Sequence, residues 1–220
     1  MNKYKMSKEE NEILPNLLNL NKKEDFMKKK KKIYLFLFNG FSDWEIAYLS
    51  PEIKKSEEFE LIYFSTDGNQ VTSMGGLQIV PDISLHEINV DEVELLILPG
   101  GHAWEKGENC EIDLLTKTMF DQSKTIAAIC AATTYLGEQG FLDKLIHTSN
   151  DLYYVKQIAP QYAGERNYIN SLAVTDKNII TAKGIAPIEF AREIFEKLKL
   201  HSKQDIEKWF QLFKNGIWSE

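Results

Sequence analysis

The sequence predicts an α/β fold in which helices cover both faces of a mainly parallel β-sheet. Apolar runs of strand length alternate with segments of helical periodicity along most of the chain. The runs are apolar throughout, as expected for strands that are buried on both faces. Turn residues or small residues follow several of these runs, and ligands of such folds bind beyond the carboxyl ends of the strands. We therefore expect a functional site at that edge of the sheet.

The first half of the chain supplies the elements up to the middle of the sheet. The apolar run at 33–38 predicts the first strand, after which we expect a helix at 43–56 and a second strand at 60–65. Residues 71–80 resemble a hairpin interrupted by Gly75-Gly76. The apolar run at 94–98 predicts a buried strand, because it ends at the turn Pro99-Gly100-Gly101.

The second half continues the alternation. A helix expected at 112–123 precedes a buried strand at 125–129, which leads into a helix at 131–138. We expect a further helix at 150–158 and short strands at 172–175 and 179–182 around the turn Asp176-Lys177-Asn178. Helices at 187–198 and 202–213 close the chain, and apolar residues share one face of the last one. That helix is expected to pack on the domain.

Composition bounds the class of protein. The chain has 220 residues, 43% of them hydrophobic, which suits one α/β domain with a substantial core. The net charge of −7 argues against binding to nucleic acid or to an anionic membrane. Two cysteines give no disulfide framework, which indicates the reducing cytoplasm. No apolar run approaches the ~18 residues of a membrane helix.

The chain divides into three parts by composition. Residues 1–27 are rich in Lys, Glu and Asn and read as an N-terminal tail or extension. Residues 28–200 carry the strand and helix alternation, and 201–220 hold the closing helix.

Cys130 is the strongest candidate for chemistry. It ends the strand at 125–129 and is followed at once by Ala131-Ala132, so it stands at a strand-to-helix corner with room around it. A helix start favours anions, and the thiolate is the nucleophilic form of cysteine. We therefore expect an ionised nucleophile here. Cys110 lies among acidic residues and is interpreted as incidental.

Four landmarks in order resemble the ThiJ/PfpI family of the class I glutamine amidotransferase-like superfamily. They are Asp43-Trp44-Glu45, Leu98-Pro99-Gly100-Gly101, Ala127-Ala128-Ile129-Cys130 and Thr181-Ala182-Lys183-Gly184. The resemblance covers about residues 32–198. It implies a flavodoxin-like three-layer sandwich with a nucleophile elbow, a homodimer and a small-molecule substrate. No metal or cofactor is expected, because no Cys/His cluster has zinc spacing and no glycine-rich loop has the P-loop or dinucleotide pattern.

The resemblance also assigns roles. Cys130 would be the nucleophile, and Glu45 would contact it as a protonated carboxyl with a raised pKa, although an acid in a first helical turn is ordinary. The N–H groups of Gly101 and Ala131 would form an oxyanion hole. Gly100 and a group of nearby side chains would line the pocket, namely His102, Trp104 and Asn150. Trp104 and the glycine pair also suit plain packing and a plain turn.

The general base is less well defined. Protease-like members of the family place a His directly after the Cys, where this chain has Ala131, so peptidase activity is not expected. No His lies in 182–190, which argues against a glutaminase. Another family position for a His falls near Asn150. His147 is the first candidate for the base and His102 the second.

Two functions remain open at this point. The first is a cysteine-dependent hydrolase or lyase that acts on a small carbonyl or amide compound, as a deglycase, a glyoxalase-like enzyme or an amidase. The second is a non-enzymatic redox or stress-response sensor in which Cys130 is oxidised reversibly. A degenerate family member that only binds a ligand is a third reading.

Overall fold

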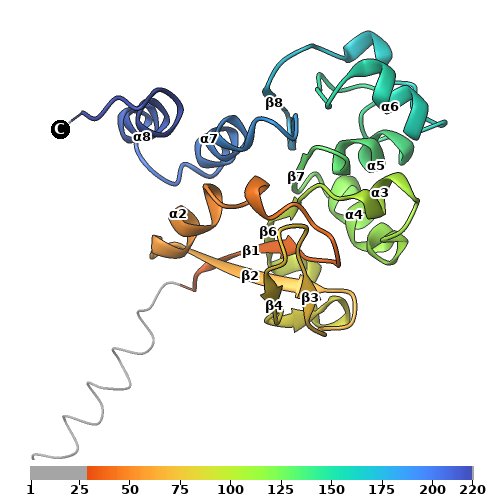
Figure 1. Ribbon diagram of the computed structural model, residues 1–220. Helices are drawn as coiled ribbons and strands as arrows, with labels where there is room; N and C mark the ends of the chain where they lie inside the picture. Colours follow the sequence, from red (N-terminus) through yellow and green to blue (C-terminus); the bar gives the residue numbers. More distant parts are fainter. Residues whose placement is uncertain (1–28, 220) are drawn as a thin grey trace, which may run out of the picture. The chain divides into compact units, whose positions relative to one another are not determined.

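The computed structural model describes residues 29–219, and the chain from Lys31 onward forms one compact unit (Figure 1). The expected N-terminal tail at 1–27 lies outside the described residues. Among the helices of the described residues, none is both long enough and apolar enough to cross a membrane.

A seven-stranded sheet forms the centre of the unit. Its order is β5 (Ile83–Ser84), β2 (Phe59–Ser65), β1 (Lys31–Phe36), β6 (Val93–Leu98), β7 (Thr125–Ile129), β9 (Ile179–Ala182) and β8 (Ala173–Asp176). All neighbours pair in parallel except β8, which is antiparallel to β9. A separate hairpin pairs β3 (Val71–Thr72) with β4 (Gln78–Ile79). The predicted fold class is confirmed.

Helices lie on both sides of this sheet. In Figure 1, α2 (Leu49–Lys55), α7 (Pro187–Leu198) and α8 (Lys203–Asn215) lie on one side of the strands. The other side carries α3 (His102–Glu105), α4 (Asp113–Asp121), α5 (Ala132–Glu138) and α6 (Leu152–Ile158). Short 3-10 turns occupy Asp43–Glu45, Leu85–Glu87, Val90–Glu92, Cys110–Ile112 and Glu165–Asn167. The result is the expected three-layer arrangement.

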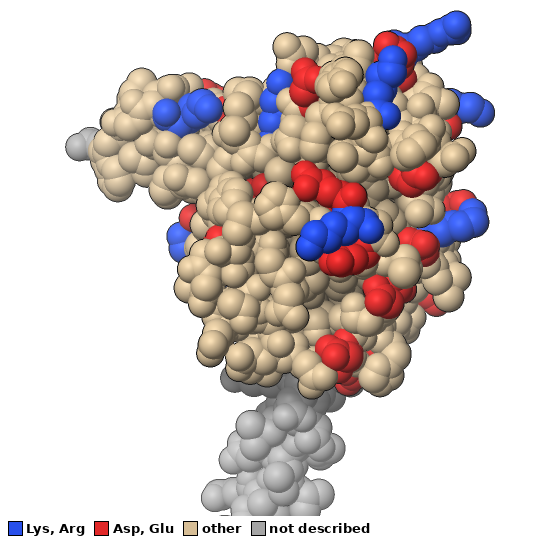
Figure 2. Space-filling view, turned by 45° about the vertical axis from the view of Figure 1, so that its right-hand side comes forward, with Lys and Arg blue, Asp and Glu red and all other residues tan. Residues whose placement is uncertain are grey.

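The core explains why the apolar runs became central strands. Phe36 on β1, Leu95 on β6 and Ile126 on β7 are wholly buried, because helices cover both faces at these positions. The closing helix α8 buries Ile206 and packs Trp209 against Phe195 of α7, with 4.9 Å between the ring centroids. On the face shown in Figure 2, acidic side chains are interspersed with basic ones and no continuous basic patch is visible.

One predicted helix is broken in the structure. The segment 43–56 forms a 3-10 turn at Asp43–Glu45 and only then the helix α2, which begins at Leu49. Pro51 lies in the first turn of α2, and proline is tolerated in a helix there because those N–H groups need no intrahelical partner. The helix therefore starts just before Pro51, and the preceding turn is free to direct Glu45 inward.

Candidate active site

Cys130 occupies a sharp corner between β7 and α5. Its φ of 61° is in the left-handed region, which non-glycine residues seldom adopt. Two sets of hydrogen bonds hold the corner. The Cys130 N–H donates to the Ala182 carbonyl at 3.0 Å, and the Cys130 carbonyl accepts from the Thr133 N–H at 3.1 Å and the Thr133 hydroxyl at 2.6 Å. The residue as a whole is partly exposed.

The Glu45 carboxyl lies beneath this corner and is wholly buried. The Gly100 N–H donates to its Oε2 at 2.6 Å. Its Oε1 has no nitrogen or oxygen donor in the described part of the chain, and its polar neighbour is the Cys130 thiol. Burial raises the pKa of Glu45 from 4.5 to about 7, and this outweighs the hydrogen bonds from Gly100, Cys130 and Ser42. The direction agrees with the sequence expectation.

Two donors contact the sulfur from the other side. The Asn150 Nδ2 lies 3.4 Å from the Cys130 Sγ, and the Ala131 N–H also donates to the sulfur. The Asn150 amide is oriented by the Gly184 N–H, which donates to its Oδ1 at 2.9 Å. Because Oδ1 must accept that bond, the donor end of the amide faces the sulfur.

The expected low pKa of Cys130 is not found. Burial of the sulfur, followed by the negative charge of Glu45, raises the pKa of the thiol to about 12 against the lowering effect of Asn150 and Ala131. The sequence argument relied on the start of α5, but that helix has only seven residues and the sulfur lies beside a carboxyl group. Glu45 raises the pKa of the thiol, and the hydrogen bond from the thiol lowers the pKa of Glu45, so Cys130 and Glu45 titrate as one coupled pair.

Glycines allow the backbone to pass close to this pair. A Cβ on Gly100 would lie 2.6 Å from the Cys130 Cβ and 2.8 Å from Glu45 Oε2. A Cβ on Gly184 would lie 2.6 Å from the Cys130 Sγ. Gly101 has a φ of 151°, and a Cβ there would meet the Gly40 carbonyl oxygen at 2.7 Å. Gly100 and Gly184 therefore have to be glycines, because a larger residue at either position would clash with the thiol or the carboxyl.

Two of the expected site residues have other contacts. His147 is fully buried, with Nδ1 2.7 Å from the Leu145 carbonyl oxygen and Nε2 2.7 Å from the Tyr162 hydroxyl. Burial lowers its pKa. The structure therefore gives both ring nitrogens structural partners and does not bring them to the sulfur. Trp104 is also buried, and its indole N–H donates to the Pro99 carbonyl at 2.8 Å, so it packs in the core beside the turn at Pro99.

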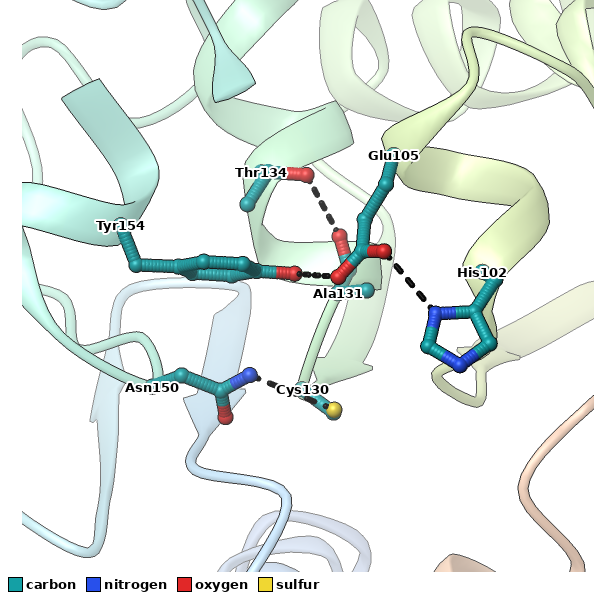
Figure 3. Close-up of polar contacts among 7 residues, drawn as sticks. All are labelled: His102, Glu105, Cys130, Ala131, Thr134, Asn150 and Tyr154. Carbon is teal, nitrogen blue, oxygen red and sulfur yellow. Dashed lines mark hydrogen bonds and ion pairs between the residues drawn. The ribbon is translucent and has the colours of Figure 1, made fainter. Parts of the chain in front are cut away.

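His102 lies at the mouth of the site with two partners that the sequence did not indicate. Its Nδ1 is 2.9 Å from Glu105 Oε2, and the Tyr154 hydroxyl donates to Glu105 Oε1 at 2.7 Å (Figure 3). His102 and Glu105 are three residues apart on α3, a spacing at which helical side chains meet. Tyr154 comes from α6, and no local pattern could have connected it with α3.

The model of the DJ-1/PfpI family matches residues 31–197. The chain belongs to the DJ-1/PfpI family. The match spans every element from β1 to α7, including the corner at Cys130 and the turn at Glu45.

Individual DJ-1/PfpI relatives carry different names. A Bacillus subtilis protein called "Uncharacterized protease YoaZ" is 39% identical over 193 residues, which cover 84% of this chain and 91% of that protein. The solved structure of a ThiJ/PfpI family protein from Bacillus anthracis is 37% identical, with a TM-score of 0.78, and covers 86% of this chain and 92% of its own. A deglycase from Thermococcus kodakarensis is 32% identical over 112 residues, which cover 50% of this chain and 67% of that enzyme. The family therefore includes members named as proteases and members named as deglycases.

The described residues of this DJ-1/PfpI chain hold no group of three or more His, Cys, Asp or Glu side chains placed to bind a metal ion.

Proposed function

We propose that this protein is a cysteine-dependent enzyme that acts on small carbonyl compounds, with 2-oxoaldehydes as the substrate class. The observation that carries the proposal is the coupled pair of Cys130 and Glu45 in a partly exposed corner. A thiol with hydrogen-bond donors on one side and a proton-accepting carboxyl on the other is suited to nucleophilic attack. The deglycase name of one relative agrees with carbonyl chemistry.

The position of the proton in the pair follows from its contacts. When Glu45 is ionised, the donor left for the buried Oε1 is the Cys130 thiol, which is a weak hydrogen-bond donor. A protonated Glu45 can donate from Oε1 to the sulfur, while Asn150 and Ala131 donate to the same sulfur. The thiolate with a neutral Glu45 satisfies every polar atom of the pair. Above a pH of about 7 the pair carries one negative charge, and the attacking form arises when the thiol proton passes to Glu45.

The first step of the proposed reaction is addition to the aldehyde. The Cys130 Sγ forms a C–S bond with the aldehyde carbon, and the π electrons of the C=O bond move to its oxygen. The N–H groups of Gly101 and Ala131 stabilise the developing alkoxide, which then takes the proton from Glu45. In the complete reaction, one water is added and a 2-oxoaldehyde becomes a 2-hydroxy acid. The aldehyde carbon is oxidised and the neighbouring ketone carbon is reduced, so no external oxidant is needed.

Aldehydes suit this site better than amides do. Cleavage of an amide requires an acid that protonates the departing amine, which is usually an imidazole next to the nucleophile. Here Ala131 follows Cys130, so no imidazole stands next to the nucleophile. The Asn150 amide that contacts the sulfur neither gains nor loses a proton near neutral pH. Addition to an aldehyde has no leaving group, so this first step needs only the Glu45 proton.

Turnover of methylglyoxal tests the proposal. We expect the wild-type protein to form lactate, and Cys130→Ser to fall to the rate of the uncatalysed reaction, because a serine hydroxyl is far less acidic than a thiol. Cys110→Ser is the matched control, since Cys110 is exposed and lies outside the site. Equal activity of Cys130→Ser and wild type would contradict the proposal.

A redox sensor is the second candidate, and the same hydrogen-bond donors around the sulfur support it. Oxygen atoms added to the Cys130 sulfur could accept hydrogen bonds from a protonated Glu45, from Asn150 and from the Ala131 N–H. We expect mild peroxide to oxidise the Cys130 thiol before the Cys110 thiol, although Cys110 is the more exposed residue. Peptide mass analysis after graded oxidation measures this order, and equal oxidation of both thiols would rule the sensor out.

A further inference from the structure

A hydrogen-bond network of three polar side chains lies across the mouth of the site, with Glu105 at its centre. Glu105 accepts from the Tyr154 hydroxyl through Oε1 and contacts His102 Nδ1 through Oε2, at 2.7 and 2.9 Å (Figure 3). The His102 side chain is 71% exposed, so its remaining nitrogen is accessible to a molecule that enters from solvent. These contacts connect α3 with α6 over the corner at Cys130.

The contacts within this network fix the charges of its side chains. The hydrogen bond from Tyr154, and then the one from His102, lowers the pKa of Glu105, so it remains a carboxylate. Burial and the Glu105 charge raise the pKa of Tyr154, so its hydroxyl remains a donor. A carboxylate can only accept, so His102 must present Nδ1–H to it. In the neutral imidazole the basic lone pair is then on Nε2, which is exposed.

The two ends of this network lie on either side of the Cys130 sulfur. His102 follows Gly101 directly, and the neighbouring Gly100 backbone lies against the Cys130 side chain. At the other end, Tyr154 hydrogen-bonds with Asn150 and interacts electrostatically with Cys130. A substrate bonded to the Cys130 sulfur would therefore extend into the space between α3 and α6, next to the imidazole of His102.

We propose that His102, oriented by Glu105, is the general base of the reaction at Cys130, with Tyr154 as a positioning residue for Glu105. The assignment rests on the proposed function. After addition of the aldehyde, His102 Nε2 removes the proton from the carbon bonded to sulfur, and the electron pair forms a C=C bond as the ketone becomes an enolate. The hydroxyl proton on the carbon bonded to sulfur passes to the enolate oxygen, His102 returns its proton to the former ketone carbon, and a thioester of the 2-hydroxy acid remains on Cys130. Water then attacks the thioester and gives a proton to Nε2, and the C–S bond breaks to restore the thiolate. The proton on Nε2 finally passes through solvent to Glu45, which had given its own proton to the alkoxide.

The experiment compares two substrates, methylglyoxal and p-nitrophenyl acetate. The ester acylates Cys130 with loss of p-nitrophenolate, and only the hydrolysis of the acyl-enzyme needs the base. We expect His102→Gln to keep the initial burst of p-nitrophenolate and to lose at least about 100-fold in turnover of both substrates. Alkylation of Cys130 by iodoacetamide should stay within about twofold of wild type, because no base is needed there. His86→Gln is the matched control, an exposed histidine that bonds Ser84.

Chemical rescue separates a base from a structural residue. We expect imidazole added to His102→Ala to restore part of the turnover, since the site is open to solvent at this position. Glu105→Gln and Tyr154→Phe should lower kcat about tenfold and leave KM unchanged, because they orient the base without binding substrate. A merely structural role would give no rescue by imidazole.

The outcomes distinguish the two proposals. Turnover of His102→Gln within about threefold of wild type, or failure of imidazole to rescue His102→Ala, overturns the His102 assignment and leaves the proposed function standing. Wild-type turnover of the ester without turnover of methylglyoxal overturns the proposed substrate class, and the ester then decides the role of His102. A wild-type protein that turns over neither substrate overturns both.

Discussion

Replacing Glu45 with glutamine is expected to stabilise the protein at neutral and alkaline pH by up to about 3 kcal/mol. The folded protein raises the pKa of this carboxyl from 4.5 to about 7, so ionisation is harder in the folded state than in the unfolded state. The cost is absent below pH 4.5, grows as the pH rises from 4.5 to about 7, and is constant above that value. Glutamine has no proton to lose, so the variant avoids this cost.

Denaturant unfolding from about pH 4 to about pH 8 measures the effect. The free energies of unfolding of wild type and Glu45→Gln should differ little at the acid end and diverge steadily toward the alkaline end. Glu57→Gln, at an exposed position on the surface, is the matched control and should show no such divergence. Parallel curves for wild type and Glu45→Gln would show that the carboxyl ionises normally in the folded protein.

The same substitution should reduce the reactivity of Cys130. In the wild type, the thiol proton passes to Glu45, and we expect the alkylation rate to rise through a pH of about 7 and then to level off. In Glu45→Gln the Glu45 charge no longer opposes ionisation of the thiol, but burial, the larger cause, still does, and the thiol must release its proton to solvent. We expect the rate near neutral pH to fall about tenfold or more. Stability and reactivity thus change in opposite directions, as expected when a buried charge is kept for function.

The elements that sequence reasoning identified are those with a strong apolar pattern. The strands at 94–98 and 125–129 were evident because they are buried on both faces, and β6 and β7 form there with shifts of at most one residue. The strand β5 and the helix α3 were not predicted, because two and four residues are too few to establish a period. The helix expected at 43–56 is interrupted because one proline sets the start of α2.

The site was predictable where the chain itself brings residues together. Cys130 was evident from the strand that ends at it, and the family register placed Glu45. His147, the first candidate for the base, is close to Asn150 in sequence but belongs to an extended segment that pairs with Tyr168, whereas the base proposed above, His102, was the second candidate. Residues three apart in such a segment point to opposite sides, so only Asn150 reaches the sulfur.

Gly184→Ala is expected to close the space in front of the sulfur. The new Cβ would lie 2.6 Å from the Cys130 Sγ and 3.2 Å from Glu45 Oε1, distances at which one of the groups must move. The sulfur has little freedom to move, because the corner is held by hydrogen bonds on both sides of Cys130. We expect alkylation of Cys130 and turnover of methylglyoxal to fall at least about 100-fold. The free energy of unfolding should fall by about 1–3 kcal/mol, as for other overpacked sites.

Gly107→Ala separates this effect from a general loss of stability. Gly107 has a φ of 68°, and a Cβ there would meet no atom within 4 Å, so the substitution costs about 1–2 kcal/mol of backbone strain only. We expect this variant to lose stability to a similar extent and to keep the alkylation rate of Cys130. If Gly184→Ala also kept the wild-type rate, reagents would have to reach the sulfur from the side of His102 and Tyr154 alone. The Gly184 backbone would then serve to orient the Asn150 amide and would not line the approach to the thiol.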